Sequence, residues 1–354
     1  MSLQTAWYKN SAWLYLLWPL ALLFRVFAWW RRRYLEARQS RHFASTSASV
    51  PVIVVGNITV GGTGKTPLLM YLVSLLQEHG RTPGIISRGY GGRSSSYPLQ
   101  VLPDSDPRLA GDEPVLMARK LHAMSGRNVE IWVDPKRTRA RDAALAGGQC
   151  DILLSDDGLQ HYALARQLEI VVMDAERGLG NGLCLPAGPL REPAGRLREV
   201  DFILLNGQAE NRLAHGYPDK TFTMQLHADA LVNLCSGERV TLAAVAEHEQ
   251  LKNLLKPASL AEQFALAGIG NPQRFFRSLE QLAFHVQTRV FPDHFDYRPE
   301  HLEFAAGHLL LMTEKDAIKC ERFAQPTWWF LSLVTHTGVA FEHTFLQRVQ
   351  SFKS

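Results

Sequence analysis

The sequence predicts an α/β protein with a mostly parallel sheet between two layers of helices, a smaller C-terminal α/β domain, and an N-terminal hydrophobic helix. Three observations support this prediction. Short apolar runs rich in β-branched residues alternate with segments of helical periodicity, a glycine-rich loop follows the first of these runs, and the chain begins with an apolar stretch that ends in arginines. With 354 residues, 46% of them apolar, the chain can bury enough surface for two domains.

The N-terminal arm, residues 1–45, differs in composition from the rest of the chain. From Ala12 to Trp30 every residue except Pro19 and Arg25 is apolar, and Arg31 to Arg33 follow directly. Tryptophan prefers the membrane interface and arginine attracts anionic headgroups, so we expect a helix that lies in a membrane surface or inserts shallowly. The alternative is a hydrophobic helix packed on the protein's own core. A cleaved signal peptide fits poorly, because arginines stand where small residues should form the cleavage site.

A glycine-rich loop connects the first predicted strand to a predicted helix. The strand is Val52 to Val55, the loop GNITVGGTGKTP runs from Gly56 to Pro67, and the helical pattern continues from Leu68 to Leu76. Such loops bind phosphate because glycines let backbone N–H groups converge on the oxygens at a helix N-terminus. In this context Lys65 is expected to reach the β- and γ-phosphates of ATP, and Thr66 to bind Mg²⁺.

The loop therefore predicts a P-loop NTPase-like, three-layer α/β/α core. Thr59 stands where the usual motif has its first glycine, so the match is incomplete, but strand, loop and helix occur in the right order. The predicted nucleotide-binding residues are Thr59, Val60, Gly61, Gly62, Thr63, Gly64, Lys65 and Thr66.

Two carboxylates follow another short apolar run. The sequence DILLSDD runs from Asp151 to Asp157. It resembles a Walker B strand, which delivers a metal-binding carboxylate in nucleotide-binding proteins. Open α/β sheets place their ligands at the carboxyl ends of strands, where Asp156 and Asp157 would lie. We expect these side chains to help hold Mg²⁺; the alternative is that they cap a turn or helix.

The remaining apolar runs divide the chain into a larger core, residues 46–225, and a smaller C-terminal domain, residues 226–354. Serine-rich stretches at Ser45–Ser49 and Ser94–Ser96 suggest a linker and a mobile loop. The further predicted strands are Gly84–Ser87, Val129–Val133, Leu168–Asp174 and Asp201–Asn206 in the core, and Phe264–Ala267, His285–Phe291, Leu309–Thr313 and Trp328–Val334 in the smaller domain.

Charge and cysteine content limit the possible partners. The formal net charge of +4 is too small an excess to imply a nucleic-acid partner. The four cysteines show no metal-binding spacing, which favours reduced thiols in a cytosolic environment. No feature of the sequence points to an obligate protein partner, whereas the basic, aromatic arm predicts a membrane surface as a partner.

Five further motifs occur in a fixed order along the chain. They are SRGYGG at Ser87–Gly92, GDEP at Gly111–Pro114, DDGLQH at Asp156–His161, LPAGPLREP at Leu185–Pro193 and PDH at Pro292–His294. With the glycine loop, these motifs resemble those of the tetraacyldisaccharide 4′-kinases, although Leu159 stands where an aromatic residue is expected. The resemblance implies transfer of the ATP γ-phosphoryl group to the 4′-hydroxyl of a tetraacyl disaccharide 1-phosphate, a lipid A precursor. It also implies work at the cytoplasmic face of the inner membrane of a Gram-negative bacterium.

The same resemblance implies roles for individual residues. Asp112 is implied as the base for the acceptor hydroxyl, assisted by His294, with Lys65 stabilising the transferred phosphoryl group. Glu192 is implied as an additional Mg²⁺ ligand in a closed state. Four further residues are expected at the acceptor. Arg88 and Tyr90 could form a mobile lid near it, with a solvated turn as the alternative, and His161 could face it. Arg191 could bind phosphate charge, with an exposed ion pair as the alternative.

Two other functions remain open at this point. A membrane-associated P-loop ATPase or nucleotide switch would also use a hydrophobic arm. No guanine-selecting NKxD motif occurs, since the nearest string, at Thr313–Asp316, has a different order, and Val60 stands where partitioning ATPases usually place a second lysine. A binding module without catalysis is the third possibility, and it would not need both the metal carboxylates and Lys65.

Overall fold

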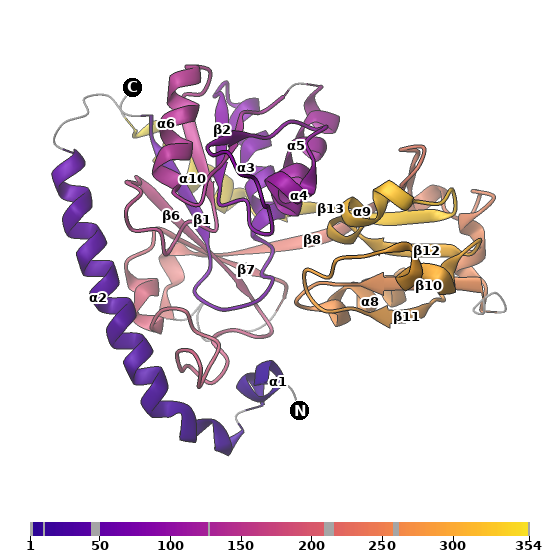
Figure 1. Ribbon diagram of the computed structural model, residues 1–354, viewed down its shortest axis with the longest axis horizontal. Helices are drawn as coiled ribbons and strands as arrows, with labels where there is room; N and C mark the ends of the chain where they lie inside the picture. Colours follow the sequence, from indigo (N-terminus) through magenta and orange to yellow (C-terminus); the bar gives the residue numbers. More distant parts are fainter. Residues whose placement is uncertain are drawn as a thin grey trace.

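The computed structural model describes residues 3–9, 11–43, 50–126, 128–208, 216–257 and 262–352, with the side chains of residues 4 and 38–43 excepted (Figure 1). Its strands form one 13-stranded sheet in the order β11-β10-β12-β13-β8-β7-β6-β1-β5-β2-β4-β3, with β9 paired to β8. Two lobes share this sheet. The first carries the glycine loop, and the second lies on the far side of β8 and β13.

The first lobe is the predicted mostly parallel core. Its strands are β1 (Val52–Gly56), β2 (Pro83–Ser87), β3 (Leu99–Gln100), β4 (Ile131–Val133), β5 (Ile152–Asp156), β6 (Leu168–Asp174) and β7 (Phe202–Asn206). Among them only β3 runs antiparallel to its neighbour. Its α-helices are α3 (Lys65–Glu78), α4 (Pro107–Ala110), α5 (Asp112–Ser125) and α6 (Arg137–Gly147). The strands predicted from the apolar runs are all present.

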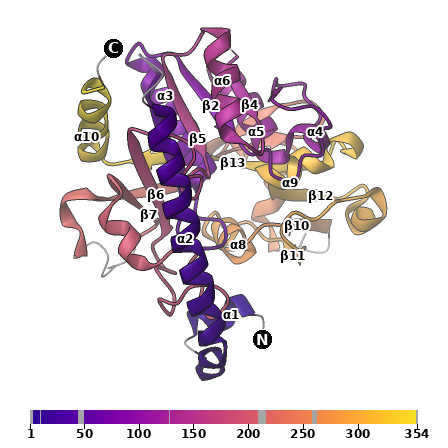
Figure 2. The ribbon, with the colours of Figure 1, turned by 60° about the vertical axis from the view of Figure 1, so that its left-hand side comes forward.

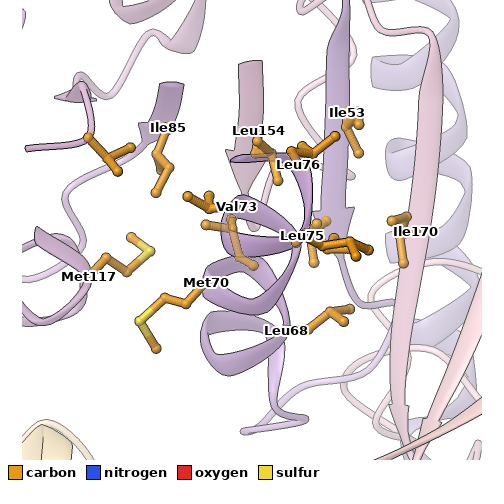
Figure 3. Packing of buried hydrophobic residues seen from close by; sticks show 14 of the residues in the cluster. Ile53, Leu68, Met70, Val73, Leu75, Leu76, Ile85, Met117, Leu154 and Ile170 are labelled. Carbon is orange, nitrogen blue, oxygen red and sulfur yellow. The ribbon is translucent and has the colours of Figure 1, made fainter. Parts of the chain in front are cut away.

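Both faces of this sheet are buried, which explains the continuous apolar runs. Helix α3 packs Leu68, Leu72 and Leu76 against one face, where Ile53 points toward it (Figure 3). The opposite face, with Val54, contacts α6 and the segment before β7. A buried leucine such as Leu72 contributes about 2–5 kcal/mol relative to alanine. This packing fixes β1 and α3, and with them the loop that joins them.

The second lobe is smaller and has two layers of helical segments around its own strands. Its strands are β8 (Thr221–Asn233), β9 (Arg239–Thr241), β10 (Gln263–Ala267), β11 (Gln287–Val290), β12 (Leu309–Thr313) and β13 (Trp328–Thr337). Its α-helices are α8 (Pro272–Gln281) and α9 (Glu314–Cys320). The two faces carry separate apolar clusters, one around Trp329 and one around Trp328.

The two lobes are joined by a long antiparallel ribbon of β8 and β13. Its pairs run from Trp329 opposite Asn233 to Thr337 opposite Met224, with an irregularity between Ser332 and Leu333. The predicted domain boundary at residue 226 falls inside β8, which also pairs with β7. The boundary at residues 45 and 46 lies outside the described residues.

The C-terminal helix belongs to the first lobe in space. Helix α10 (Val339–Gln350) packs Phe341 and Phe345 against Phe202 of β7, with ring centroids 5.5 and 6.4 Å apart. Tyr71 of α3 also donates a hydrogen bond to Glu342 at 2.6 Å. The chain therefore returns across the ribbon, and residues 226–354 do not form one spatial unit.

The arm consists of α1 (Leu3–Tyr8), a 3-10 turn (Ala12–Leu17) and α2 (Trp18–Phe43), which runs along the outside of the first lobe (Figures 1 and 2). Its start packs on the core, where Trp7 and Leu14 meet Leu185, and Arg31 and Arg32 of α2 also contact the core. Large side chains are exposed along the rest: Trp13, Leu16, Trp18, Leu23, Phe27, Trp29 and Trp30. Among the described residues, Ala12–Ala37 is the one helix long and apolar enough to cross a membrane.

Candidate active site

A cleft of about 770 Å³ lies between the carboxyl ends of the first lobe's central strands and the second lobe. The glycine loop and the ends of β2 and β5 line it from one side. From the other side come the turn before α8, the Asp293–His294 turn and the start of α9. The cleft therefore opens at the edge of the sheet where α/β proteins place their ligands.

The glycine loop is held in a phosphate-binding conformation. Gly61 and Gly64 have φ angles of +105° and +94°, which other residues adopt only with strain. Asn206 at the end of β7 donates to the Thr63 carbonyl at 2.9 Å, and a Cβ on Gly64 would lie 2.4 Å from the Asn206 amide nitrogen. Gly64 directly precedes α3, so the positive end of that helix faces the cleft.

The predicted nucleotide residues divide into two groups. Residues 61–66 line the cleft. Thr59 and Val60 are not among its lining residues and instead attach the loop to the LPAGPL segment: Thr59 forms a β-bridge with Leu190, and the Val60 N–H donates to the Pro189 carbonyl at 2.9 Å. The segment that replaces the first glycine of the motif therefore anchors the loop.

Lys65 and Asp157 face each other across the loop. The lysine Nζ lies 3.4 Å from Asp157 Oδ1, and Arg191 donates to Asp157 Oδ2 at 3.1 Å. Burial raises the pKa of Asp157, but the charges of Lys65 and Arg191 outweigh it and lower the pKa to about 2. Asp157 is therefore ionised at neutral pH and holds Lys65 in the cleft.

Asp156 is the last residue of β5 and is fully enclosed. Its Oδ2 accepts a hydrogen bond from Ser87 at 3.2 Å, whereas its buried Oδ1 has no partner within the described chain. Burial, and then the charges of Glu113 and Asp157, raise its pKa to about 7. A buried carboxylate oxygen without a donor, beside like charges, is an environment that a cation would relieve.

The protein ligands available to a metal are few. In the described part of the chain, no group of three or more histidine, cysteine, aspartate or glutamate residues could hold a metal ion by itself. Mg²⁺ often binds through one or two carboxylates, water and the phosphates of a nucleotide. Thr66, Asp156 and Asp157, which line one cleft, fit that mode.

Glu113 completes the charged end of the cleft, although sequence reasoning gave it no role. It accepts a long hydrogen bond of 3.5 Å from the Thr66 hydroxyl and forms an ion pair with Lys315 of α9. Burial opposes its ionisation, but Lys315 and Lys65 keep its pKa below the ordinary value. The second lobe therefore places a lysine beside the loop.

Asp112 and His294 come from different lobes and lie near each other. Asp112 starts α5, and burial raises its pKa, while the positive charges of Lys319 and His294 act in the opposite direction. Lys319 Nζ lies 3.8 Å from the carboxylate. His294 has a φ of +59°, and its ring centroid lies 4.8 Å from that of Tyr90. The described chain shows no hydrogen bond between Asp112 and His294, and Asp112 is not among the residues that line the cleft.

The other end of the cleft is rich in arginine. The four residues expected at the acceptor, Arg88, Tyr90, His161 and Arg191, all line it, together with Arg31 and Arg137. Burial, and then the charges of Arg137 and Arg166, lower the pKa of His161 to about 4, so the imidazole is neutral at pH 7. Its buried Nε2 has no partner within the described residues. This end offers positive charge and one neutral imidazole to an anionic, hydroxylated ligand.

Glu192 is the predicted metal ligand that the structure separates from the others. It is buried, accepts hydrogen bonds from Gln160 at 2.8 Å and from Tyr162, and lies 3.4 Å from Arg196. It is not among the residues that line the cleft. In this conformation Glu192 stabilises the loop after β5 and does not face the P-loop.

Comparison with known proteins identifies this set of motifs and geometry. The sequence model of the family described as "Tetraacyldisaccharide-1-P 4′-kinase" matches residues 13–350. The chain belongs to this family. A "Tetraacyldisaccharide 4′-kinase" of Pseudomonas aeruginosa (strain LESB58) is 47% identical over 349 residues, covering 98% of this chain and 97% of the relative. One of Pseudomonas fluorescens (strain SBW25) is 44% identical over 343 residues, covering 96% and 93%.

A solved structure of the family has the same fold. The crystal structure of the "apo" form of LpxK from Aquifex aeolicus in complex with ATP matches with a TM-score of 0.70 at 26% identity, covering 95% of this chain and 99% of the other. The predicted fold class, the ATP-dependent kinase activity and the use of ATP and Mg²⁺ are confirmed for this member of the tetraacyldisaccharide-1-P 4′-kinase family. The switch and the non-catalytic module are thereby set aside.

Two residues of the site could not be found by sequence reasoning. Glu113 is adjacent to Asp112 in GDEP, but its contact with Thr66 depends on how α5 packs beside α3. Lys315 lies in TEKD at Thr313–Asp316, whose order differs from that of the guanine-selecting NKxD motif. Its pairing with Glu113 joins residues 202 positions apart in two lobes. The adjacent acidic pair in GDEP was the available signal for Glu113.

Proposed function

We propose that the cleft phosphorylates the 4′-hydroxyl of a tetraacyl disaccharide 1-phosphate while α2 holds the enzyme at a membrane surface. As a member of its family, the protein is an ATP-dependent kinase that acts on a lipid A precursor. The observation that carries the proposal is the single cleft with the P-loop and acidic strand end at one side and arginines beside the aromatic arm at the other.

At the P-loop end, the chain's own residues neutralise and align phosphate. Lys65 pairs with Asp157 in this structure and is positioned to bind the β- and γ-phosphates of ATP in its place. The N-terminus of α3 would face the same phosphates. Thr66, Asp156 and Asp157 would hold Mg²⁺, which would neutralise negative charge on the phosphates of ATP. Glu192 would join them in a closed state only by giving up its hydrogen bonds with Gln160 and Tyr162.

At the interface of the lobes, Asp112 is proposed as the base. The raised pKa strengthens its affinity for a proton, and His294 of the second lobe is proposed to orient or polarise it. The acceptor's hydroxyl proton would pass to the Asp112 carboxylate as the hydroxyl oxygen attacks the γ-phosphorus, and the bond from that phosphorus to the β–γ bridging oxygen would break, so that ADP leaves. Because Asp112 is not among the residues that line the cleft, this step needs the acceptor or the lobes to approach it.

At the arginine-rich end, Arg88, Arg191, Tyr90 and His161 are proposed to bind the acceptor. Guanidinium groups recognise phosphate by paired hydrogen bonds, which suits the 1-phosphate of the sugar. Neutral His161 can accept or donate a hydrogen bond to a sugar hydroxyl. The sugar would lie at headgroup level, with its acyl chains remaining beside α2.

The proposed location is the cytoplasmic face of the inner membrane of a Gram-negative bacterium, with α2 peripheral or shallowly inserted. Exposed tryptophans on α2, followed by the basic residues Arg31 to Arg33, favour the headgroup layer, and basic flanks favour the cytoplasmic side. Cys150, Cys184 and Cys320 are buried free thiols, as expected in a reducing compartment. The acyl disaccharide and the membrane surface are the proposed partners.

The direct test is transfer of label from γ-labelled ATP with Mg²⁺ to a tetraacyl disaccharide 1-phosphate in detergent micelles. The lipid fraction should become labelled, and Lys65→Ala should lower the rate by about 10²-fold or more. Far-UV circular dichroism controls for folding of the variant. Release of inorganic phosphate without labelled lipid would contradict the proposal and point to an ATPase.

A further inference from the structure

Arginines contact the whole of residues 156–161, which are the end of β5 and the loop that follows it. All six of their carbonyl oxygens accept hydrogen bonds from guanidinium groups. Arg137 donates to the first two at 3.0 and 2.9 Å, and Arg166 donates to the third, fourth and sixth at 3.5, 3.0 and 2.5 Å. Arg31 donates to the fifth at 3.3 Å. Two of the three arginines belong to the core, but Arg31 belongs to the arm, so α2 takes part in shaping the cleft.

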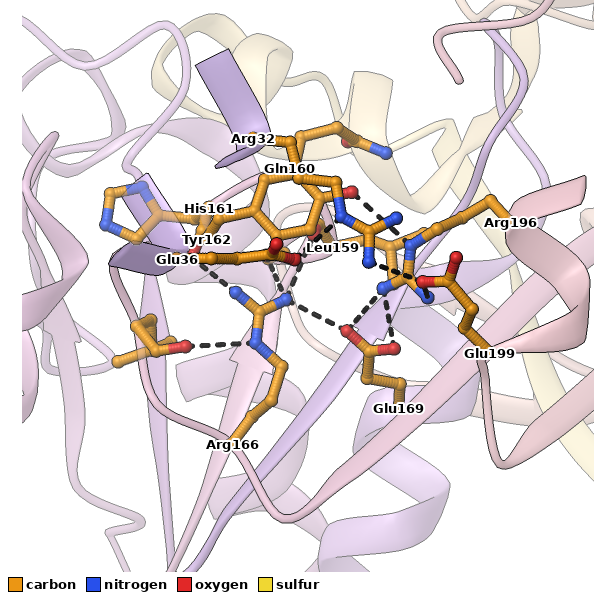
Figure 4. Close-up of polar contacts among 12 residues, drawn as sticks. Arg32, Glu36, Leu159, Gln160, His161, Tyr162, Arg166, Glu169, Arg196 and Glu199 are labelled. Carbon is orange, nitrogen blue, oxygen red and sulfur yellow. Dashed lines mark hydrogen bonds and ion pairs between the residues drawn. The ribbon is translucent and has the colours of Figure 1, made fainter. Parts of the chain in front are cut away.

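Tyr162, the next residue, is the point where the arm meets the core. Its ring is buried, and three guanidinium groups face it (Figure 4). The centroid distances are 5.0 Å for Arg32, 5.5 Å for Arg166 and 5.9 Å for Arg196. Its hydroxyl donates to Glu192. Tyr162 thus connects a residue of α2 to the same arginine that holds the loop carbonyls.

Arg32 is fixed from both sides. Its Nε lies 2.7 Å from Glu36 on α2, and its other end forms an ion pair with Glu199 of the core. Glu199 also lies 3.5 Å from Arg196. A displacement or rotation of α2 would therefore move Arg32 against both the Tyr162 ring and the Glu199–Arg196 pair.

The neighbouring Arg33 provides a natural contrast. It carries the same charge on the same helix, but its guanidinium lies over Trp29 of α2, 5.9 Å from the ring centroid. Within the described residues it makes no hydrogen bond or ion pair with the core, and Glu199 experiences its charge only at longer range. The two arginines should attract an anionic membrane equally, but of the two only Arg32 contacts the described residues of the core.

We infer that Arg32 is a positioning residue that couples the seating of α2 in the membrane to the placement of Gln160 and His161 in the cleft. Lipid contact sets the position of α2, Arg32 transmits it to Tyr162, and the Arg31 and Arg166 hydrogen bonds hold the loop that presents His161. This inference rests on the proposed membrane location and acceptor end. According to this inference, Gln160 and His161 take their acceptor-binding positions only when α2 is bound to the membrane that contains the acceptor.

The test compares full-length Arg32→Gln with Arg33→Gln, each of which removes one positive charge from the arm. Vesicles of zwitterionic and anionic phospholipid carry the acceptor. Vesicle affinity should fall equally in the two variants, and ATP affinity should be the same. At saturating vesicle concentration, turnover of Arg32→Gln should be lower than that of Arg33→Gln by about 5- to 30-fold, the effect of one lost partly buried cation–π contact and ion pair. Arg32→Lys should recover part of the loss.

A double-mutant cycle separates coupling from general destabilisation. If the effect travels through the ring, Arg32→Gln should change turnover little in a Tyr162→Leu background and fully in a Tyr162→Phe background, which keeps the ring. Equal turnover of Arg32→Gln and Arg33→Gln, with active wild type, would overturn the inference and leave the proposed function intact. Absence of lipid phosphorylation by the wild type would instead refute the proposed function.

Discussion

The two ends of the cleft differ in how their positively charged side chains are paired. At the P-loop end, charges of opposite sign alternate and pair: Lys65 with Asp157, Glu113 with Lys315, and Asp112 with Lys319. At the other end only Arg191 pairs with a carboxylate, Asp157, among the described arginines of the cleft lining there. Arg31, Arg88 and Arg137 form no salt bridge within the described chain, and Arg31 and Arg137 donate to backbone carbonyls instead.

This difference indicates how each end should respond to its ligand. The paired end must exchange partners when ATP and Mg²⁺ arrive, so binding there is coupled to rearrangement and to pH. At the arginine-rich end, Arg31 and Arg88 have no carboxylate partner within the described chain, so an anionic headgroup can bind them without first displacing one. Acceptor binding should accordingly be the more sensitive of the two to salt.

The largest expected effect concerns the pair at the lobe interface. Asp112→Asn removes the proposed base but keeps the shape of the side chain, so kcat should fall by about 10²-fold or more, with ATP affinity nearly unchanged. Label transfer and ATP titration measure the two quantities. The surface variant Asp151→Asn is the matched control. A folded Asp112→Asn protein with wild-type turnover would remove Asp112 from the mechanism.

A smaller effect should appear in the pH dependence of Mg²⁺–ATP binding. The pKa of Asp156 is raised to about 7, so below that pH the carboxylate must lose a proton before it can hold the cation. Affinity should rise by up to about tenfold per pH unit below pH 7 and level off above it. Calorimetry at pH 6, 7 and 8 in buffers of different ionisation enthalpy would detect the released proton. Equal affinity at all three pH values, without proton release, would show that Asp156 is already ionised.

How far the sequence could predict this molecule depends on the range of the contacts. The P-loop and the strand that ends at Asp156 are local patterns, and the structure puts both at one cleft. The β8–β13 ribbon pairs segments about 100 residues apart, and α10 packs on residues still further away in the chain, such as Phe202 and Tyr71. No local period reveals such contacts. The predicted boundary at residue 226 therefore fell inside a strand.

The site shows the same limit. Arg88, Tyr90 and His161 were placed together only through resemblance to a family, because their joint position depends on two separate loops, one after β2 and one after β5. Glu192 follows Arg191 directly, but its side chain is turned into the network around Tyr162, and sequence spacing cannot show that orientation. The contacts of Arg31 and Arg32 with the core lie more than 120 positions away in the chain.

The most direct test of the contrast between the two ends is one variant, Arg88→Gln, measured for both ligands. Its KM for the acyl disaccharide should rise by about tenfold, because one charge-assisted phosphate contact is lost, while its Kd for ATP should stay within twofold of the wild type. That result would assign the arginine-rich end to the acceptor. A Kd for ATP that weakens as much as the acceptor KM would contradict the division of the cleft.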